Sequence, residues 1–316
     1  MPQPTNDADD RDERRAQRHS TGGTGRAEPI DGAVASKRPA PGLHVVATPI
    51  GNRGDITLRA IETLRGADLI ACEDTRVTGP FLAGLGVAAP LIAYHDHNAE
   101  RVRPTIMARL GQGAVVAIVS DAGTPLVSDP GYRLVQECIA AGIAVTALPG
   151  ASAPLAALVV SGLPTDRFLF AGFPPPKGGA RRTMLAGLAS VPATLVFFEG
   201  PSRLADSLAD MAQILGDRPA AVARELTKLY EEVRRGPLST LAAHYRDTGP
   251  PRGEIVVVVG PPADAVPEDD DAVDGHLRAA LRTMRVKDAA TAVAAATGRP
   301  KREVYARALA LAGEAE

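Results

Sequence analysis

The sequence predicts an α/β fold with two α/β domains and a small C-terminal helical module. Short apolar runs alternate with amphipathic segments along residues 43–150, a pattern typical of the strands and helices around a parallel sheet. New strand patterns follow between residues 168 and 259, and they require a second core. With 316 residues and 45% hydrophobic content, the chain has enough material for both cores.

The expected parts of the chain differ in composition. Residues 1–40 contain almost no large apolar side chain, so they cannot offset the entropy lost on ordering; their arginines leave open a contact with RNA. Beyond residue 272 the chain is rich in Ala and Arg and lacks strand signals. We therefore expect a disordered tail (1–40), an N-terminal α/β domain (41–153), a C-terminal α/β domain (154–262), an acidic linker (263–272) and a helical module (273–316).

The first domain begins with a predicted strand over residues 43–48. Thr57 is expected to cap a helix that ends at Gly66, because Thr accepts hydrogen bonds from a first helical turn and Gly favours helix ends. The elements expected next are strands over 67–72 and 91–94 and a helix over 104–110.

The central unit of this domain joins two buried strands, residues 114–119 and 143–148, through a helix. That helix is expected to have Asp129 as its cap and Pro130 at its first position. Loops at the carboxyl ends of parallel strands meet at one sheet edge, where ligands bind, and Gly lets the backbone approach a ligand closely. Two such loops of small residues follow the strands, at 120–131 and 149–152.

The second domain is expected to combine further strands with helices that have one apolar face. The predicted strands are 168–171, 194–198, 220–223 and 254–259, and the predicted helices are 151–161, 204–215 and 238–245. The C-terminal module is expected to hold three short helices, around 277–284, 289–294 and 304–311. Its basic residues favour contact with nucleic acid in the manner of a helix-turn-helix unit, and an Ala-rich packing or dimerisation bundle remains the alternative.

Several classes of function are disfavoured by the sequence. The G-x-G-x-x-G spacing of dinucleotide-binding folds is missing after the first strand, which disfavours nicotinamide and flavin chemistry. His95 and His97 have no companion ligand at convincing spacing, so we expect no metal. Cys72 and Cys138 lie in apolar segments and are expected as core residues in a reducing compartment. No run reaches the roughly 18 apolar residues of a membrane span.

Three charged clusters follow predicted strands, and each has two interpretations. Residues 73–76 are either part of a site or a structural ion pair between Asp74 and Arg76. Lys177, Arg181 and Arg182 lie in a Pro-rich loop that either contacts phosphate or is merely solvated. Residues 224–232 form either a polar wall facing a substrate or a solvated face. The net charge of −2 does not decide between these interpretations, because it hides local patches.

Several of these segments together resemble one known family, the ribosomal RNA small-subunit methyltransferase I family. The matching motifs are Thr48-Pro49-Ile50-Gly51-Asn52 with Asp55, residues 73–76, residues 120–131, Pro149-Gly150-Ala151, residues 224–228, and Gly253-Glu254. The C-terminal module also resembles that family's helix-turn-helix tail.

The resemblance implies a fold of the tetrapyrrole-methylase type, with S-adenosylmethionine held in the cleft between the two α/β domains. It also implies a cytoplasmic homodimer that methylates the 2′-oxygen of cytidine 1402 in the decoding region of 16S rRNA, in the small ribosomal subunit. A methylase of tetrapyrroles or other small molecules, and a non-catalytic RNA-binding protein on the same fold, are the alternatives. The chain departs from the family at residues 198–203, where relatives more often carry a His, and this weakens a base at that position.

Candidate site residues follow from these loops and motifs. Asp74, His95, Glu199, Glu225 and Glu231 are possible bases, of which we rank Glu225 and His95 first. The residues expected to bind the cofactor are Pro49, Asp121, Ala122, Gly123, Ser128, Ala151 and Ser152. The residues expected to bind RNA are Arg76, Lys177, Arg181, Arg182, Arg224 and Lys228.

Overall fold

The computed structural model describes residues 38–263 and 270–313. The tail predicted over 1–40 therefore falls almost entirely outside the described residues, as does most of the predicted linker. No helix within the described ranges is long and apolar enough to cross a membrane.

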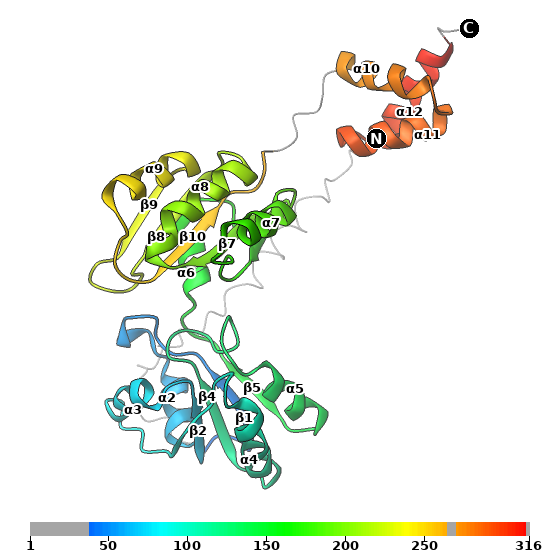
Figure 1. Ribbon diagram of the computed structural model, residues 1–316. Coiled ribbons are helices and arrows are strands. Elements are labelled where there is room, and N and C mark those ends of the chain that lie inside the picture. The colour runs from blue at the N-terminus through cyan, green and yellow to red at the C-terminus, as the bar shows by residue number, and fades with distance from the viewer. Residues whose placement is uncertain (1–37, 264–269, 314–316) are drawn as a thin grey trace, which may run out of the picture. The chain divides into compact units, whose positions relative to one another are not determined.

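The first domain is built on a five-stranded, fully parallel sheet of order β3-β2-β4-β1-β5 (Figure 1). β4 is central and buried along its whole length, as its β-branched run predicts. The strands are β1 (Gly42–Val46), β2 (Leu69–Cys72), β3 (Leu91–Ala93), β4 (Val115–Val119) and β5 (Val145–Leu148).

Helices cover both faces of this sheet. Side chains of α2 (Leu58–Arg65) and α3 (Thr75–Ala83) share one core with the strands, while α4 (Ala99–Gly111) and α5 (Tyr132–Ala140) share another. The two free cysteines are buried, Cys72 in the first core and Cys138 in the second, which confirms them as core residues. The caps of α2 are also confirmed: the Ala60 N–H donates to Thr57 Oγ1 at 3.1 Å, and Gly66 ends the helix.

Two helix predictions in this domain were wrong, and one helix was missed. α5 starts after Gly131 and not at Pro130, because Leu126, Ser128 and Gly131 have positive φ and coil the loop before helical geometry begins. α4 starts at Ala99 and keeps Pro104 in its interior, whereas we placed proline at the start. α3 was missed, because Gly79 and Pro80 disfavour helix.

The second domain has a mixed sheet of order β6-β7-β10-β8-β9, in which only β6 and β7 are parallel. The strands are β6 (Phe168–Phe170), β7 (Thr194–Glu199), β8 (Pro219–Arg224), β9 (Glu232–Pro237) and β10 (Ile255–Val259). β9 was not predicted, because its charged residues interrupt any apolar alternation. A 3-10 turn, η2 (Pro201–Arg203), follows β7.

One face of the second sheet packs against α7 (Gly178–Leu188), α8 (Leu204–Leu215) and α9 (Leu238–Thr248). The other face packs against α6 (Ala153–Ser161), and Ile50 from the first domain belongs to the same core cluster. A loop of the first domain therefore completes the core of the second.

The predicted basic loop around residue 181 is largely helix. Gly178 begins α7, and Arg181 is buried in a salt bridge between its Nε and Asp210 Oδ2 at 2.6 Å. Arg182 approaches the other carboxylate oxygen of Asp210 at 3.3 Å. Arg181 is therefore a structural residue and does not fit the predicted contact with phosphate, since its guanidinium would first have to leave the interior.

The C-terminal module contains the three helices that the sequence predicts, α10 (Asp270–Leu281), α11 (Val286–Thr297) and α12 (Lys301–Gly313), around a core of their own. Asp270 and Asp271, which we assigned to the acidic linker, form the first turn of α10. Asp270 accepts from Arg299 and Arg307, and these ion pairs tie the helices together.

Loss of the buried Arg181–Asp210 pair should destabilise the second domain. Asp210→Ala leaves the Arg181 charge buried without a partner, so we expect the free energy of unfolding to fall by about 3–5 kcal/mol. Asp206→Ala, at an exposed position of the same helix, should cost less than about 1 kcal/mol. Chemical denaturation measures both, and equal losses would show that the pair contributes little.

Candidate functional site

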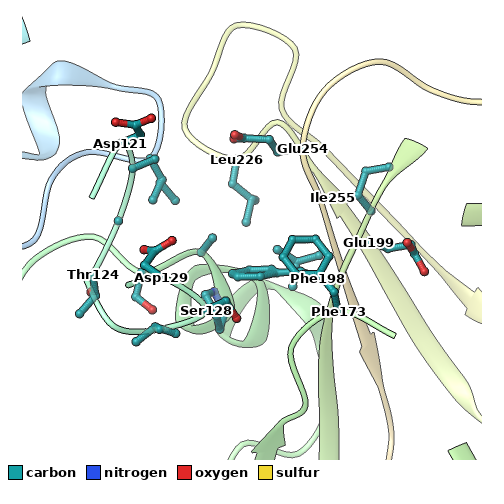
Figure 2. A pocket seen from close by; sticks show the side chains of 18 of the residues that line it. Asp121, Thr124, Ser128, Asp129, Phe173, Phe198, Glu199, Leu226, Glu254 and Ile255 are labelled. Atoms are coloured by element: carbon teal, nitrogen blue, oxygen red, sulfur yellow. The ribbon is translucent and has the colours of Figure 1, made fainter. Parts of the chain in front are cut away.

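A cavity of about 430 Å³ is lined by loops of both α/β domains. The first domain contributes the loop after β4, the second contributes the end of β7 and the start of β10, and the start of α6 completes the lining (Figure 2). The volume is that of an ordinary small-molecule site.

The loop after β4 is fixed to its neighbours by hydrogen bonds. Thr48 and Gly123 exchange two backbone bonds, of 2.8 and 3.1 Å, and Thr124 Oγ1 donates to the Ala151 carbonyl at 3.0 Å. Gly123 has φ +80°, and a Cβ there would lie 3.3 Å from Ile50 Cγ2. Leu126 and Ser128 also have positive φ, a strained conformation that persists mostly at functional sites.

The cavity has an aromatic wall, formed by Phe173 and Phe198, and an acidic wall, formed by Glu73, Asp121 and Asp129. Phe173 and Phe198 lie on the side of the second domain, with ring centroids 5.2 Å apart, opposite Ser128 and Asp129 (Figure 2). An aromatic wall of this kind offers a flat apolar surface to a planar ring.

The acidic wall carries unfavourable negative charge. Burial, together with Asp121, raises the pKa of Glu73, and burial also raises the pKa of Asp121. For Asp129, burial and the neighbouring Glu73 raise the pKa to about 6. Three carboxyl groups that resist ionisation beside one cavity suit a bound cation, which would relieve their repulsion.

Glu199 is fully buried and its carboxylate is saturated. It accepts from the Gly200 N–H at 2.7 Å, from Arg203 at 2.8 Å and from the hydroxyl of Ser207. Although Glu199 lines the cavity, its side chain points away from Asp129 in Figure 2. It therefore anchors the end of β7 and is poorly placed to accept a proton from a ligand.

Glu225, ranked first as a base, is instead the anchor of a loop. Its carboxylate accepts from Lys228 Nζ at 2.8 Å and from the Glu254 N–H at 3.0 Å, and the bond from Lys228 lowers its pKa. A Cβ at Gly253 would overlap this carboxylate, which explains the glycine. Glu225 lines neither this cavity nor the neighbouring one described below, and a strongly paired carboxylate is a weak base.

His95 also stands outside the cavity lining. Its backbone N–H donates to Asn98 Oδ1 at 2.9 Å, at the start of α4. Its Nδ1 is buried without a hydrogen-bond partner in residues 38–263 and 270–313. Neither of the two bases that we ranked first therefore reaches the cavity.

Most of the residues expected to bind the cofactor do lie at the cavity. Ala151 is not in the lining, but its carbonyl accepts the hydrogen bond from Thr124 Oγ1. Pro49 lines the smaller neighbouring cavity. Those in the lining are Asp121, Ala122, Gly123, Ser128 and Ser152. We missed Asp129 because we expected it as a helix cap, and we missed the aromatic wall because single Phe residues at strand ends resemble core positions.

The residues expected to contact RNA lie in unlike settings. Arg76 forms the ion pair with Asp74, at 2.6 Å, that the sequence offered as the structural interpretation of residues 73–76. The Arg76 side chain is nevertheless 88% exposed. Arg224 pairs with Glu232 at 3.2 Å, and Lys228 with Glu225 and Glu254 at 2.8 Å each. Lys177 is exposed at the start of α7. Among the described residues, no group of three or more His, Cys, Asp or Glu side chains is arranged to hold a metal ion.

Comparison with known proteins identifies the family. Residues 42–242 match the Tetrapyrrole (Corrin/Porphyrin) Methylases, and residues 267–312 match the RsmI C-terminal HTH domain. Ribosomal RNA small subunit methyltransferase I of Mesorhizobium japonicum is 54% identical over 272 residues, which cover 86% of this chain and 92% of that protein. The chain belongs to the ribosomal RNA small subunit methyltransferase I family. The protein of the same name from Escherichia coli O157:H7 is 44% identical, over 84% of this chain and 94% of that protein.

These matches confirm the resemblance drawn from the motifs and the tetrapyrrole-methylase fold. The solved structure of a diphthine synthase has a TM-score of 0.54 and 18% identity over 69% of this chain and 89% of that one, and it supports the fold alone. As a member of the family, the chain is an rRNA methyltransferase that uses S-adenosylmethionine.

Because the pKa of Asp129 is raised, replacing this residue by Asn should stabilise the protein by an amount that depends on pH. Because this carboxyl group is harder to ionise in the folded than in the unfolded chain, its ionisation destabilises the fold as the pH rises through about 6. Asp129→Asn should therefore raise the free energy of unfolding by about 1–2 kcal/mol at pH 8, and the gain should shrink towards pH 4. Denaturant titrations at both pH values measure this, and a loss of stability at pH 8 would contradict it.

Proposed function

We propose that the chain transfers the methyl group of S-adenosylmethionine to the ribose 2′-oxygen of a cytidine, cytidine 1402 in family terms, in the decoding region of 16S rRNA. The observation that carries the proposal is the cavity between the two α/β domains, with an aromatic wall facing an acidic one. Its lining contains no Lys or Arg among the described residues, which suits a cofactor with a cationic sulfur.

The residues present fit this cofactor. The aromatic pair offers a surface for its adenine, the backbone around Gly123 allows close approach, and Glu73, Asp121 and Asp129 complement its positive charges. When bound, the cofactor supplies an activated methyl group on a good leaving group. The task left to the protein is to position the attacking hydroxyl, which is worth about 7–11 kcal/mol when the geometry is good.

In the proposed reaction the ribose 2′-oxygen would take the methyl group that the bound cofactor supplies, and the hydroxyl proton would leave to a base of the protein. We assign that base to Asp129. It lines the cavity, and its pKa of about 6 leaves it ionised at neutral pH yet far more basic than an ordinary carboxylate. This assignment replaces Glu225 and His95.

Contact with the rest of the RNA is assigned to exposed basic residues away from the cavity. Lys177 is one, and the helical module supplies others at Arg278, Arg282, Arg285, Lys287, Lys301 and Arg302. Such contacts position the RNA and make its binding dependent on salt. The homodimer, the assembled small subunit as substrate and the cytoplasmic location remain part of this proposal, and they are supported by the family alone.

The product identifies the reaction. Small ribosomal subunits that lack the modification should accept labelled methyl from S-adenosylmethionine, and nuclease digestion should recover the label on the ribose of one cytidine. In the same assay Asp129→Asn should lower kcat by about 10²-fold or more and abolish the rise in rate through pH 6. Label on a base would contradict the proposed atom. Label on a small molecule alone would favour a tetrapyrrole-type methylase.

A further inference from the structure

A second cavity, of about 250 Å³, adjoins the first. Ile50, Asp121, Ala122 and Glu254 line both cavities, so the two cavities meet at three residues of the first domain and one of the second. A group held in one cavity therefore lies against the same residues as a group held in the other.

The two cavities differ in charge. All the ionisable side chains that line the first are carboxyl groups, whereas the second is lined by two carboxyl groups, Asp121 and Glu254, and by two cations, Arg53 and Lys228. Since Lys228 is paired with Glu225 and Glu254, Arg53 is the group of the second cavity that can bind an anion, whereas the first cavity favours a cation. Since an RNA nucleotide carries its negative charge on phosphate, this contrast assigns opposite cavities to the two reactants.

Arg53 is the cation whose charge is not compensated locally. Lys228 makes two ion pairs of 2.8 Å, but no carboxylate within residues 38–263 forms a salt bridge with Arg53. Its side chain is exposed, and its terminal nitrogen lies near Gly84, at the end of α3. A guanidinium in this setting can donate two parallel hydrogen bonds to a phosphate.

Phe81 adds an aromatic surface to the second cavity. It belongs to α3, is partly buried against the first core, and still contributes to the cavity lining. Proteins recognise unpaired RNA bases by stacking them on such rings and by holding the adjoining phosphate with basic side chains. The second cavity thus combines an aromatic ring with a guanidinium that forms no salt bridge among the described residues, next to the proposed site of the methyl donor.

We infer that the second cavity is the subsite for the nucleotide that receives the methyl, with Arg53 bound to a phosphate of the RNA and Phe81 in contact with its base. The inference rests on the proposed function, because it assumes that the substrate is RNA. Arg53 lies between Asn52 and Asp55, two residues of the first family motif, and the sequence pattern predicts no role for it.

Arg53→Gln tests the subsite. In steady-state assays with small ribosomal subunits we expect KM for the subunit to rise about 10-fold, with kcat within about 2-fold and the Kd for S-adenosylmethionine unchanged. The slope of log affinity against log salt, measured with a single-stranded RNA of decoding-region sequence, should fall by about 0.7 for one lost phosphate contact. Phe81→Leu, which keeps the bulk of the core, should also raise KM.

Arg101→Gln is the matched control, since Arg101 is equally exposed in the first domain but lines neither cavity, and it should behave as wild type. If wild-type protein methylates the subunit while Arg53→Gln keeps the wild-type KM and salt slope, the subsite is wrong and the proposed function stands. If wild-type protein labels no RNA, the proposed function fails, and an unchanged salt slope for RNA binding by Arg53→Gln still overturns the subsite on its own.

Discussion

The site depends on a close contact between the backbone of the loop after β1 and side chains of the loop after β8. A Cβ at Gly51 would overlap the stem of Lys228, the Asn52 N–H donates to Thr227 Oγ1 at 3.1 Å, and Ile50 fills the core of the second domain. In the loop after β8, Glu225 and Thr227 have positive φ, each at a cost of about 1–3 kcal/mol. Hydrogen bonds to the Glu225 carboxylate offset that strain. Both cavities form where these two loops meet.

The two cavities differ in the ionisable side chains that line them. The first cavity is lined by carboxyl groups whose ionisation is unfavourable. Their ionisation destabilises the folded chain, but it also favours the binding of a cation. The basic residues at the loop after β8 are mostly neutralised by neighbours, as Lys228 is by Glu225 and Glu254. Charge along the sequence is thus a poor guide to charge at the site, because Lys228 pairs not only with the nearby Glu225 but also with Glu254, 26 positions away in the chain.

Features carried by one continuous stretch of sequence could be predicted, whereas features that depend on a partner side chain could not. Buried strands such as β4 and β10 carry their own signal, and the small-residue loops after β4 and β5 located the first cavity correctly at Gly123 and Ser152. The role of Arg181 could not be predicted, because its partner Asp210 lies 29 positions away in the chain. Glu225 has Lys228 only three residues away, but its other contact, the Glu254 N–H, comes close only in the fold. Asp129 was placed at a helix cap because local preference favours it there, and the positive φ values of the preceding loop override that preference.

Calorimetry of S-adenosylmethionine binding to Gly51→Val tests most directly the claim that contact between the two loops forms the cofactor site. Valine should push the Lys228 loop away and with it the Leu226 and Glu254 side of the cavity, so we expect affinity to fall by about 10-fold or more while circular dichroism shows both sheets intact. Gly187→Val, at an open position of α7, should bind as wild type. Wild-type affinity in Gly51→Val would contradict the account.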